Sequence, residues 1–390
     1  MNNNPSKEDI INQAIRFHLQ GNIPEATKYY EYCIAQDLND SKIFSNYGTI
    51  LRDLGKLEDA EISSRKAIKL NPDIAFAHSN LGNVLRDLGK LKDAELLFRK
   101  AIKLNSDLAG AYSNLGGILR DLGKLQELIY LSKSILESIS MNQGYKLRAS
   151  LLLTIAYLLQ GDYAKTLFYL KQTNQFMGQD ALNIIPDETT RKYTSNFFKY
   201  INALYPLLTQ ENKKPNSKKI AHFGESHCLS FAHQNLSISS QIKKIQPVLI
   251  TGGKAWHFAN NKNNKWKDSL TQQIKNHTYC DEVFISFGEI DCRKEEGILP
   301  YASKKNKNIS EVCEETIKGY LNYMEKVLSP HYSKKYYFGV PAPSREKGSL
   351  DELDIKRIET IKIYNSLLKK EVLTRGSFFL DVFALTSNQN

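Results

Sequence analysis

The stretch Leu51-Arg52-Asp53-Leu54-Gly55-Lys56-Leu57 occurs three times in the chain. It returns at 85–91 and again at 119–125, and each copy lies 34 residues after the one before. A period of this length is typical of a helical-hairpin repeat, in which each unit packs on its neighbours because it cannot bury its apolar face alone. The repeated stretch therefore predicts an elongated all-helical array.

Small residues inside each period follow a known repeat pattern. The two best units carry Gly48, Gly55, Ala60 and Pro72 in the first, and Gly82, Gly89 and Ala94 in the second. This pattern resembles the tetratricopeptide repeat family, in which paired helices approach closely at the small residues. The resemblance implies an all-α solenoid whose concave groove, lined by the first helix of each repeat, receives a peptide or a partner protein.

The chain is too long for a single core, because 390 residues exceed the size at which one hydrophobic core stops growing. We expect a multidomain protein with a repeat array at 7–210, a linker at 211–218 and a second domain at 219–390. Within the array we place repeats near 7–40, 41–74, 75–108 and 109–142, followed by divergent helices up to residue 210.

Two polar residue types recur at the repeat period. They are Asn46, Asn80 and Asn114 on the predicted first helices, and Arg52, Arg86 and Arg120 at the far ends of the same helices. The family resemblance implies that the asparagines form a ladder that hydrogen-bonds the backbone of a bound peptide. The alternative is that repeat duplication preserved them without any role in binding. For the arginine row, we favour a solvated surface.

A different periodicity follows the linker. Short runs rich in Ile, Val, Phe and Tyr occur at 219–223, 247–250, 282–287, 335–340 and 377–383, and helical patterns fill 309–328 and 353–372. Strands that alternate with helices predict an α/β three-layer domain with a parallel sheet covered on both faces. In such a sheet the ligand site lies off the carboxyl ends of the strands.

The loops that follow the first three predicted strands carry distinctive residues. They read Gly-Glu-Ser-His at 224–227, Thr-Gly-Gly at 251–253 and Gly-Glu-Ile-Asp-Cys-Arg at 288–293. Their order resembles the SGNH (GDSL-like) hydrolase and acyltransferase superfamily over residues 218–390. The resemblance implies an SGNH/flavodoxin-like fold and a serine esterase or O-acyltransferase that acts on an acylated carbohydrate or another small ester.

The resemblance also implies roles for individual residues. Ser226 would attack the ester carbonyl, and its own N–H together with that of Gly252 or Gly253 would bind the oxyanion. Asp291 would brace the loop of Ser226, and Arg293 would replace the oxyanion asparagine of the family. The alternative for Ser226 is a simple helix N-cap.

Two departures from the family pattern weigh against catalysis. Ile290 stands where the oxyanion asparagine should be, and the Asp-x-x-His block is missing because Asp381 is followed by Ala384. A serine without a base is a poor nucleophile, so we expect either a chain truncated before the histidine or an inactive site. The other possible bases are His227, His257 and His277.

Composition narrows the classes of function. The formal charge is +11, but the lysines are mixed with acids and no nucleic-acid-binding motif is visible, so we predict no nucleic acid partner. No apolar run is long enough to cross a bilayer and the five cysteines show no paired spacing, which predicts a cytoplasmic protein without a membrane span, disulfide, metal or cofactor. We therefore expect a protein-binding repeat array with an inactive SGNH-like domain, and the esterase or acyltransferase as the alternative.

Overall fold

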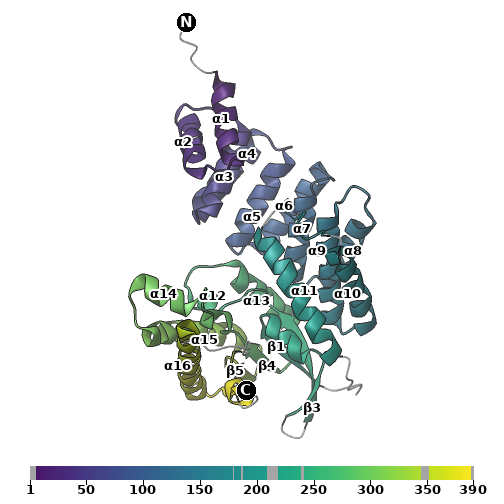
Figure 1. The fold of residues 1–390 in the computed structure, drawn as a ribbon, viewed down its shortest axis with the longest axis vertical. Coiled ribbons are helices and arrows are strands. Elements are labelled where there is room, and N and C mark those ends of the chain that lie inside the picture. Colours follow the sequence, from purple (N-terminus) through teal and green to yellow (C-terminus); the bar gives the residue numbers. More distant parts are fainter. Residues whose placement is uncertain are drawn as a thin grey trace.

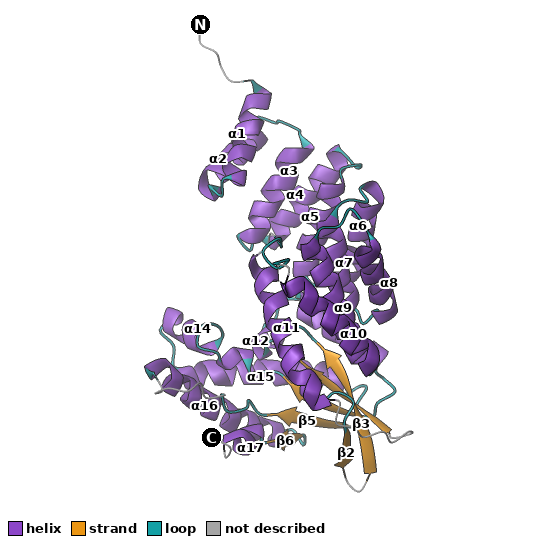
Figure 2. Cartoon of the chain, turned by 45° about the vertical axis from the view of Figure 1, so that its right-hand side comes forward, coloured by secondary structure: helices purple, strands orange, loops and turns teal. Residues whose placement is uncertain are grey.

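The computed structural model describes residues 6–178, 180–185, 188–208, 218–238, 241–343 and 351–387. A curved stack of paired helices leads into a sheet surrounded by further helices (Figures 1 and 2). Most of the predicted linker, residues 211–217, lies outside the described residues. The two halves are in direct contact, and that contact builds the site discussed below.

The array consists of hairpins of similar length. Its helices are α1 (Lys7–Leu19), α2 (Ile23–Ala35), α3 (Ser41–Asp53), α4 (Leu57–Leu70), α5 (Ala75–Asp87), α6 (Leu91–Leu104), α7 (Ala109–Asp121), α8 (Leu125–Glu137), α9 (Gln143–Gln160), α10 (Tyr163–Gly178) and α11 (Glu188–Leu208). The pairs α3–α4 and α5–α6 repeat the same helix bounds 34 residues apart, as the sequence period predicts.

Glycine ends the first helix of each of these pairs. Gly55 has a φ of +76°, a conformation that costs little only for glycine. Its N–H donates to the carbonyl of Arg52 at 2.9 Å, and the N–H of Lys56 donates to that of Leu51 at 2.8 Å. These bonds satisfy the last carbonyls of α3 and turn the chain into α4. Gly89 repeats the turn with a φ of +75°.

The array core comes from the spacing of leucines along the first helices. Leu81 and Leu85 on α5, like Leu115 and Leu119 on α7, are four residues apart and face the same side. All four are buried and pack against Phe98 of α6 and its neighbours in one apolar cluster that continues into α9. This continuity makes successive hairpins stack as a single solenoid.

The C-terminal half contains six strands among its described residues. They are β1 (Lys218–Gly224), β2 (Asn235–Ile238), β3 (Gln241–Leu249), β4 (Glu282–Ser286), β5 (Lys334–Phe338) and β6 (Phe378–Leu380), and the helices between and after them are η1 (Ser226–Phe231), α12 (Ala255–Ala259), α13 (Lys265–Asn276), η2 (Ile290–Cys292), α14 (Ile298–Lys305), α15 (Ile309–Leu328), α16 (Glu352–Thr374) and α17 (Val382–Ser387).

The sheet is mixed, whereas the sequence predicts a parallel one. The strand order is β2-β3-β1-β4-β5-β6, and every neighbouring pair is parallel except β2 and β3. The pattern misses β2 because this edge strand has four residues and alternates too little to stand out. It also places the start of β3 late, since 241–246 is rich in Gln and Lys.

Helices pack on both faces of the sheet, but they do not all come from the C-terminal half. One face packs against α12, α13, α14, α15 and α16 in the largest apolar cluster of the chain. Toward the other face, Leu249 of β3 joins Cys228 and Leu229 of η1 in a cluster with α9, α10 and α11. The end of the repeat array thus supplies part of that layer.

Helix α13 docks on the array through hydrogen bonds to helix ends. Three of its side chains donate to carbonyls at the end of α7: Gln273 Nε2 to Arg120 O at 3.3 Å, Ser269 Oγ to Asp121 O at 2.8 Å and Asn276 Nδ2 to Leu122 O at 3.2 Å. A fourth, Asp268, accepts the first N–H of α6, that of Leu91, at 2.9 Å. Groups at helix ends lack the regular helical partner, and among these four the carbonyl of Arg120 also accepts the N–H of Gly123 at 2.9 Å. The C-terminal half therefore supplies hydrogen-bond partners to backbone groups at the helix ends of the array.

A second set of bonds docks the end of α9. His233 Nε2 donates to the carbonyl of Leu158 at 2.8 Å, and Gln246 Nε2 donates to that of Leu159 at 3.2 Å. Two separate contact regions, α13 on α6–α7 and the β2–β3 region on α9, fix the halves in one orientation.

Two further sequence expectations concern cysteines and membranes. All five cysteines are buried and free. Among the described helices, none has the length and apolar character needed to cross a bilayer.

We predict that Gly89→Ala destabilises the protein more than Gly55→Ala does. Both residues have nearly the same positive φ, so each substitution carries the left-handed penalty of about 1–2 kcal/mol. A Cβ at Gly55 meets nothing within 4 Å, but at Gly89 it would lie 2.4 Å from the backbone of Asn264, just before α13. Overpacking of this kind adds about 1–3 kcal/mol.

Chemical denaturation of the two variants measures the difference in their free energies of unfolding. Limited proteolysis should also cut Gly89→Ala faster between the two halves. Equal losses of stability in the two variants would show that α13 does not press on the turn at Gly89.

Candidate functional site

The asparagines predicted to form the groove ladder lie on α3, α5 and α7. Asn80 Nδ2 donates to Ser45 Oγ at 2.9 Å, and Asn114 Nδ2 donates to Asn83 Oδ1 at 3.0 Å, so each of these amides bridges two neighbouring first helices. Asn46 lies beside Tyr30 of the preceding hairpin. The three residues therefore share one environment along the array, where they connect repeat to repeat.

A pocket with a volume of about 790 Å³ lies where the array meets the C-terminal half. Its walls come from the ends of α3, α5 and α7, the start of α9, the region of α11 and, on the other side, the loop after β3 with the start of α13. Of the three predicted asparagines, Asn114 lines this pocket, together with its partner Asn83. The pocket thus continues the groove into the domain interface.

The arginine row lines this pocket, which corrects our interpretation of it as a solvated surface. Arg52, Arg86 and Arg120 all belong to the wall, and each is hydrogen-bonded to the aspartate that follows it, Asp53, Asp87 or Asp121. Arg120 is only 8% exposed. The sequence shows that Arg-Asp recurs at the repeat period. It does not show that the docked C-terminal half covers these residues, so that they line a pocket.

Helix α11 holds one side of the pocket. The hydroxyl of Tyr193 accepts a hydrogen bond from Arg120 Nη1 at 2.7 Å, and Arg148 of α9 donates to Ser113 of α7. Burial raises the pKa of Tyr193 above its ordinary value, so the phenol stays protonated. These contacts connect α7, α9 and α11 into one rigid wall.

Lys265 is the cation that the C-terminal half brings to the pocket. Its ammonium lies 4.7 Å from the centre of the Trp266 ring, which holds it by a cation–π contact. Burial lowers the pKa of Lys265, and the positive charge of Arg86 lowers it further while Asp87 opposes the effect. Charges of both signs therefore surround this ammonium.

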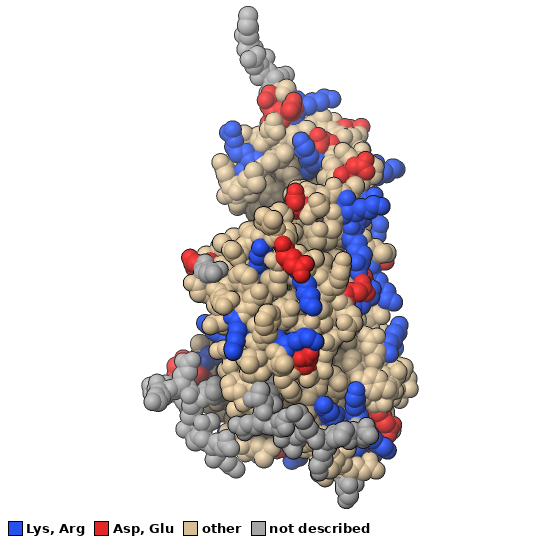
Figure 3. All heavy atoms as spheres, turned by 90° about the vertical axis from the view of Figure 1, so that its right-hand side faces the viewer, with Lys and Arg blue, Asp and Glu red and all other residues tan. Residues whose placement is uncertain are grey.

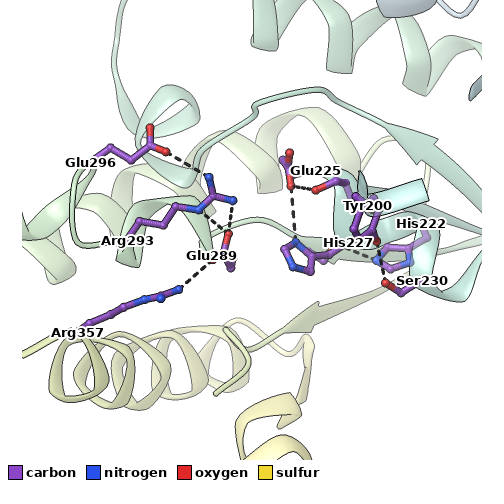
Figure 4. Close-up of polar contacts among 11 residues, drawn as sticks. Tyr200, His222, Glu225, His227, Ser230, Glu289, Arg293, Glu296 and Arg357 are labelled. Atoms are coloured by element: carbon purple, nitrogen blue, oxygen red, sulfur yellow. Dashed lines mark hydrogen bonds and ion pairs between the residues drawn. The ribbon is translucent and has the colours of Figure 1, made fainter. Parts of the chain in front are cut away.

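Ser226 lies at the carboxyl end of β1, as predicted, but it begins the short 3-10 helix η1 and is not an N-cap. Its hydroxyl donates to the carboxylate of Glu225, which also lies 3.6 Å from His227 Nδ1 (Figure 4). Burial alone would lower the pKa of His227, but the hydrogen bond with Glu225 and the charge of Glu289 raise it above the ordinary value. The serine is thus paired with a carboxylate.

An ion-pair network lies next to this serine. Glu289 accepts from Arg293 Nη2 at 2.8 Å and from Arg357 Nη2 at 3.2 Å, and Arg293 also pairs with Glu296 at 3.3 Å (Figure 4). Arg293 was predicted to stabilise an oxyanion. Its guanidinium is instead engaged by two carboxylates, and its charge also helps to lower the pKa of Glu225.

Asp291 and the two predicted glycines have structural contacts. The fully buried carboxylate of Asp291 accepts from the N–H groups of Ala255 at 2.8 Å and Trp256 at 3.0 Å, so it braces the start of α12 and not, as expected, the loop of Ser226. Burial raises its pKa to about 6. The N–H of Gly253 donates to Ile250 O at 3.1 Å, and Gly252 lines the interdomain pocket.

The other candidate bases also have partners. His257 stacks on Trp266 with ring centres 3.4 Å apart and accepts the N–H of Lys254 at 3.1 Å, and burial lowers its pKa to about 3. His277 Nδ1 donates to the carbonyl of Gln273 at 2.8 Å. Both histidines thus hold local structure around α13.

The structure divides the predicted residues of the C-terminal half between two places. Ser226 and Arg293 belong to the cluster of Glu225, His227 and Glu289, whereas Gly252 belongs to the interdomain pocket. The sequence analysis did not identify Lys265, because a lysine in the first turn of a helix is common and its distance in sequence from the array conceals their contact. Among the described residues, no group of three or more His, Cys, Asp or Glu side chains is arranged to hold a metal ion.

Charged side chains do not gather into a single band on the face of the molecule shown in Figure 3. Lys and Arg side chains alternate there with Asp and Glu and with uncharged surface. This mixture agrees with the sequence, in which basic residues are interspersed with acids.

Comparison with solved structures finds similar helical-repeat proteins. The crystal structure of MamA is 24% identical, covering 43% of this chain and 96% of its own at a TM-score of 0.39. YrrB, described as a TPR protein with an unusual peptide-binding site, is 20% identical; the match covers 50% of this chain and 94% of YrrB, with a TM-score of 0.38. The first TPR of Spaghetti (RPAP3), bound to an HSP90 peptide, is 22% identical; the match covers 30% of this chain and 93% of that structure, with a TM-score of 0.29. A search of curated proteins gave no match.

Family models match two segments of the chain. Both are described as tetratricopeptide repeat, and they cover residues 41–74 and 75–108. These ranges coincide with the second and third repeats expected from the sequence period. The N-terminal half is therefore an all-helical solenoid that contains tetratricopeptide repeats.

Proposed function

We propose that the repeat array binds a peptide or an extended segment of a partner protein in its groove. The observation that carries this proposal is the row formed by Asn46, Asn80 and Asn114, one on each successive first helix. An amide has two N–H donors and a carbonyl acceptor. Asn80 and Asn114 each use one N–H in the bond to the neighbouring helix, which leaves groups that can pair with the backbone of a bound chain.

We predict that the triple variant Asn46→Ala/Asn80→Ala/Asn114→Ala binds its peptides at least about tenfold more weakly. Each lost hydrogen bond contributes about 0.5–1.5 kcal/mol, and tenfold in affinity corresponds to about 1.4 kcal/mol. Peptides selected from a random library on the whole chain serve as probes, and calorimetry measures their dissociation constants. The variant should also melt earlier, because it loses two bonds between repeats.

The matched control is Asn71→Ala/Asn105→Ala. These asparagines recur at the same period, but they accept from Asp73 and Asp107 in the turns between repeats. The control should keep its affinity for the peptides. Unchanged affinity in the folded triple variant would mean that the asparagines only join the repeats.

For the C-terminal half we propose an SGNH/flavodoxin-like domain that binds a ligand without efficient turnover. Without the antiparallel edge strand β2, the order across the sheet is β3-β1-β4-β5-β6. Numbered along the chain, these five parallel strands have the order 2-1-3-4-5, which is that of doubly wound flavodoxin-like domains. The observation that argues against turnover is the bond from Ser226 to Glu225. A carboxylate is a weaker base than imidazole, and within the described residues no histidine is hydrogen-bonded to this serine.

A serine esterase or O-acyltransferase acting on an acylated carbohydrate or another small ester is the alternative. His227 supports it best, since its ring is held by Glu225, the same carboxylate that binds Ser226. A histidine oriented by a carboxylate next to a serine has the components of a catalytic triad, although their connection here differs from the usual serine–histidine bond.

We predict that the chain hydrolyses p-nitrophenyl acetate barely above background and that Ser226→Ala leaves this rate unchanged. The physical reason is that a serine without a bonded histidine loses most of its catalytic advantage. Initial rates at neutral pH measure it. Ser230→Ala is the control, because this serine lies in the same 3-10 helix and is hydrogen-bonded to Tyr200.

Robust hydrolysis that Ser226→Ala abolishes and Ser230→Ala preserves would instead establish the esterase. His227→Gln would then be the first variant to test as the missing base, ahead of His257 and His277, whose rings are engaged elsewhere.

A further inference from the structure

The interdomain pocket exists only when the two halves are docked. Arg52 and Arg86 come from the array, whereas Thr251, Gly252 and Lys265 come from the C-terminal half. Its volume of about 790 Å³ falls in the range of pockets that hold small organic ligands, roughly 300–1,000 Å³. A site of this size is much larger than a single inorganic anion requires.

Charge selects the class of ligand. Five cationic side chains and three carboxylates line the pocket among the residues that the structure describes: Arg52, Arg86, Arg120, Arg148 and Lys265, against Asp53, Asp87 and Asp121. Each of the three carboxylates is hydrogen-bonded to one of the arginines of the array, whereas no described carboxylate forms an ion pair with Lys265. The positive charge of Lys265, confined between low-dielectric walls that strengthen its field, therefore favours an anionic ligand.

Two of these cations have donors left for a ligand. Arg86 bonds to Asp87 through Nε, and among the described contacts no hydrogen bond occupies its two terminal nitrogens. Lys265 is held over the Trp266 ring and forms no ion pair with a described carboxylate. By contrast, all three nitrogens of Arg120 donate hydrogen bonds within the protein, to Asp121 and Tyr193, so this residue lines the pocket without a nitrogen left unbonded.

The grouping of the cations suits more than one anionic group. Arg86 Nε and Arg52 Nε lie 3.0 Å and 3.9 Å from the two oxygens of the same carboxylate, that of Asp87, so the cations of the array are close neighbours on this wall. A diphosphate offers two adjacent anionic groups to such a cluster, one more than a monophosphate. Guanidinium forks also match phosphate oxygens bidentately, which favours phosphate as the anionic group.

The closure of the groove indicates a compact ligand. Thr190 and Tyr193 of α11 form one wall and the loop 250–252 forms another. In Figures 1 and 2, α11 runs beside the last helices of the stack. An extended chain running along the groove would meet these elements, while a small molecule fits between them. Asn83, Ser113 and Asn114 add amide and hydroxyl groups suited to a sugar.

We propose that this pocket binds a small molecule carrying a diphosphate, such as a nucleoside diphosphate, with its phosphates between Arg86 of the array and Lys265 of α13. The proposal needs neither peptide binding by Asn46 and Asn80 nor any chemistry at Ser226, but it shares Asn114 with the proposed peptide groove. Because both halves would hold the ligand, binding should also tighten their contact.

Calorimetry on the full chain with ADP, UDP, inorganic pyrophosphate and UMP tests the proposal. We expect the nucleoside diphosphates to bind at least about tenfold more tightly than UMP, since a diphosphate offers the two cations one anionic group more than a monophosphate does. Lys265→Met and Arg86→Met should each weaken UDP or ADP binding at least about tenfold. Lys262→Met is the matched control, because this exposed lysine lies three residues before Lys265 and outside the pocket lining.

Three results would overturn the proposal. They are no binding of any diphosphate at millimolar concentration, unchanged affinity in both Lys265→Met and Arg86→Met, and tighter binding of a hexaglutamate peptide than of the diphosphates. The last result would assign the pocket to an acidic segment of a protein.

A second measurement distinguishes the pocket from loose anion binding at the surface. The bound diphosphate should slow proteolysis between the two halves in the wild type and in Lys262→Met, but not in Lys265→Met. If Lys265→Met loses its fold by circular dichroism, Arg86→Met decides, since Arg86 lines the pocket from α5 and its terminal nitrogens have no described hydrogen bond. Its binding should weaken, and wild-type affinity in that variant would contradict the proposal.

Discussion

The ends of the array helices must find partners for their backbone groups, and the docking of the two halves depends on this constraint. The carbonyls of residues 120–122 at the end of α7 are bonded by side chains of α13, and those of residues 158 and 159 at the end of α9 by His233 and Gln246. A buried polar group without a partner costs about 1–3 kcal/mol, so a shifted or rotated contact would lose several such bonds. The interdomain pocket inherits its shape from this single orientation.

The sequence predicts the array well because its information is periodic. Leu81 and Leu85 are repeated one period later as Leu115 and Leu119, and the same small residues end each hairpin, so local pattern and global packing agree. The contact between the halves has no such signal. Ser269, Gln273 and Asn276 read as the polar face of an ordinary amphipathic helix, and only the docked structure shows that they bond to the end of α7.

The candidate sites show the same division. Ser226 could be placed at the carboxyl end of the first strand because loops there follow from strand order. Its partner could not be predicted, since the sequence does not show that the side chain of Glu225 turns toward the serine that follows it. The arginine row was visible as a repeat and misinterpreted, because burial by a distant domain cannot be read from a helix alone. Lys265 could be identified as a candidate binding residue only in the structure, where it lines the same pocket as the arginines of the array.

Asp291 connects the two sites of the C-terminal half. Its two oxygens hold the start of α12, directly after the loop 250–252 that lines the pocket, and it lies on the same loop as Glu289 and Arg293. Because both oxygens accept backbone N–H bonds and the side chain is fully buried, this carboxylate positions the start of α12. The loop 250–252 at the pocket and the loop that carries Glu289 and Arg293 are therefore connected through this carboxylate, and the position of each depends on the other.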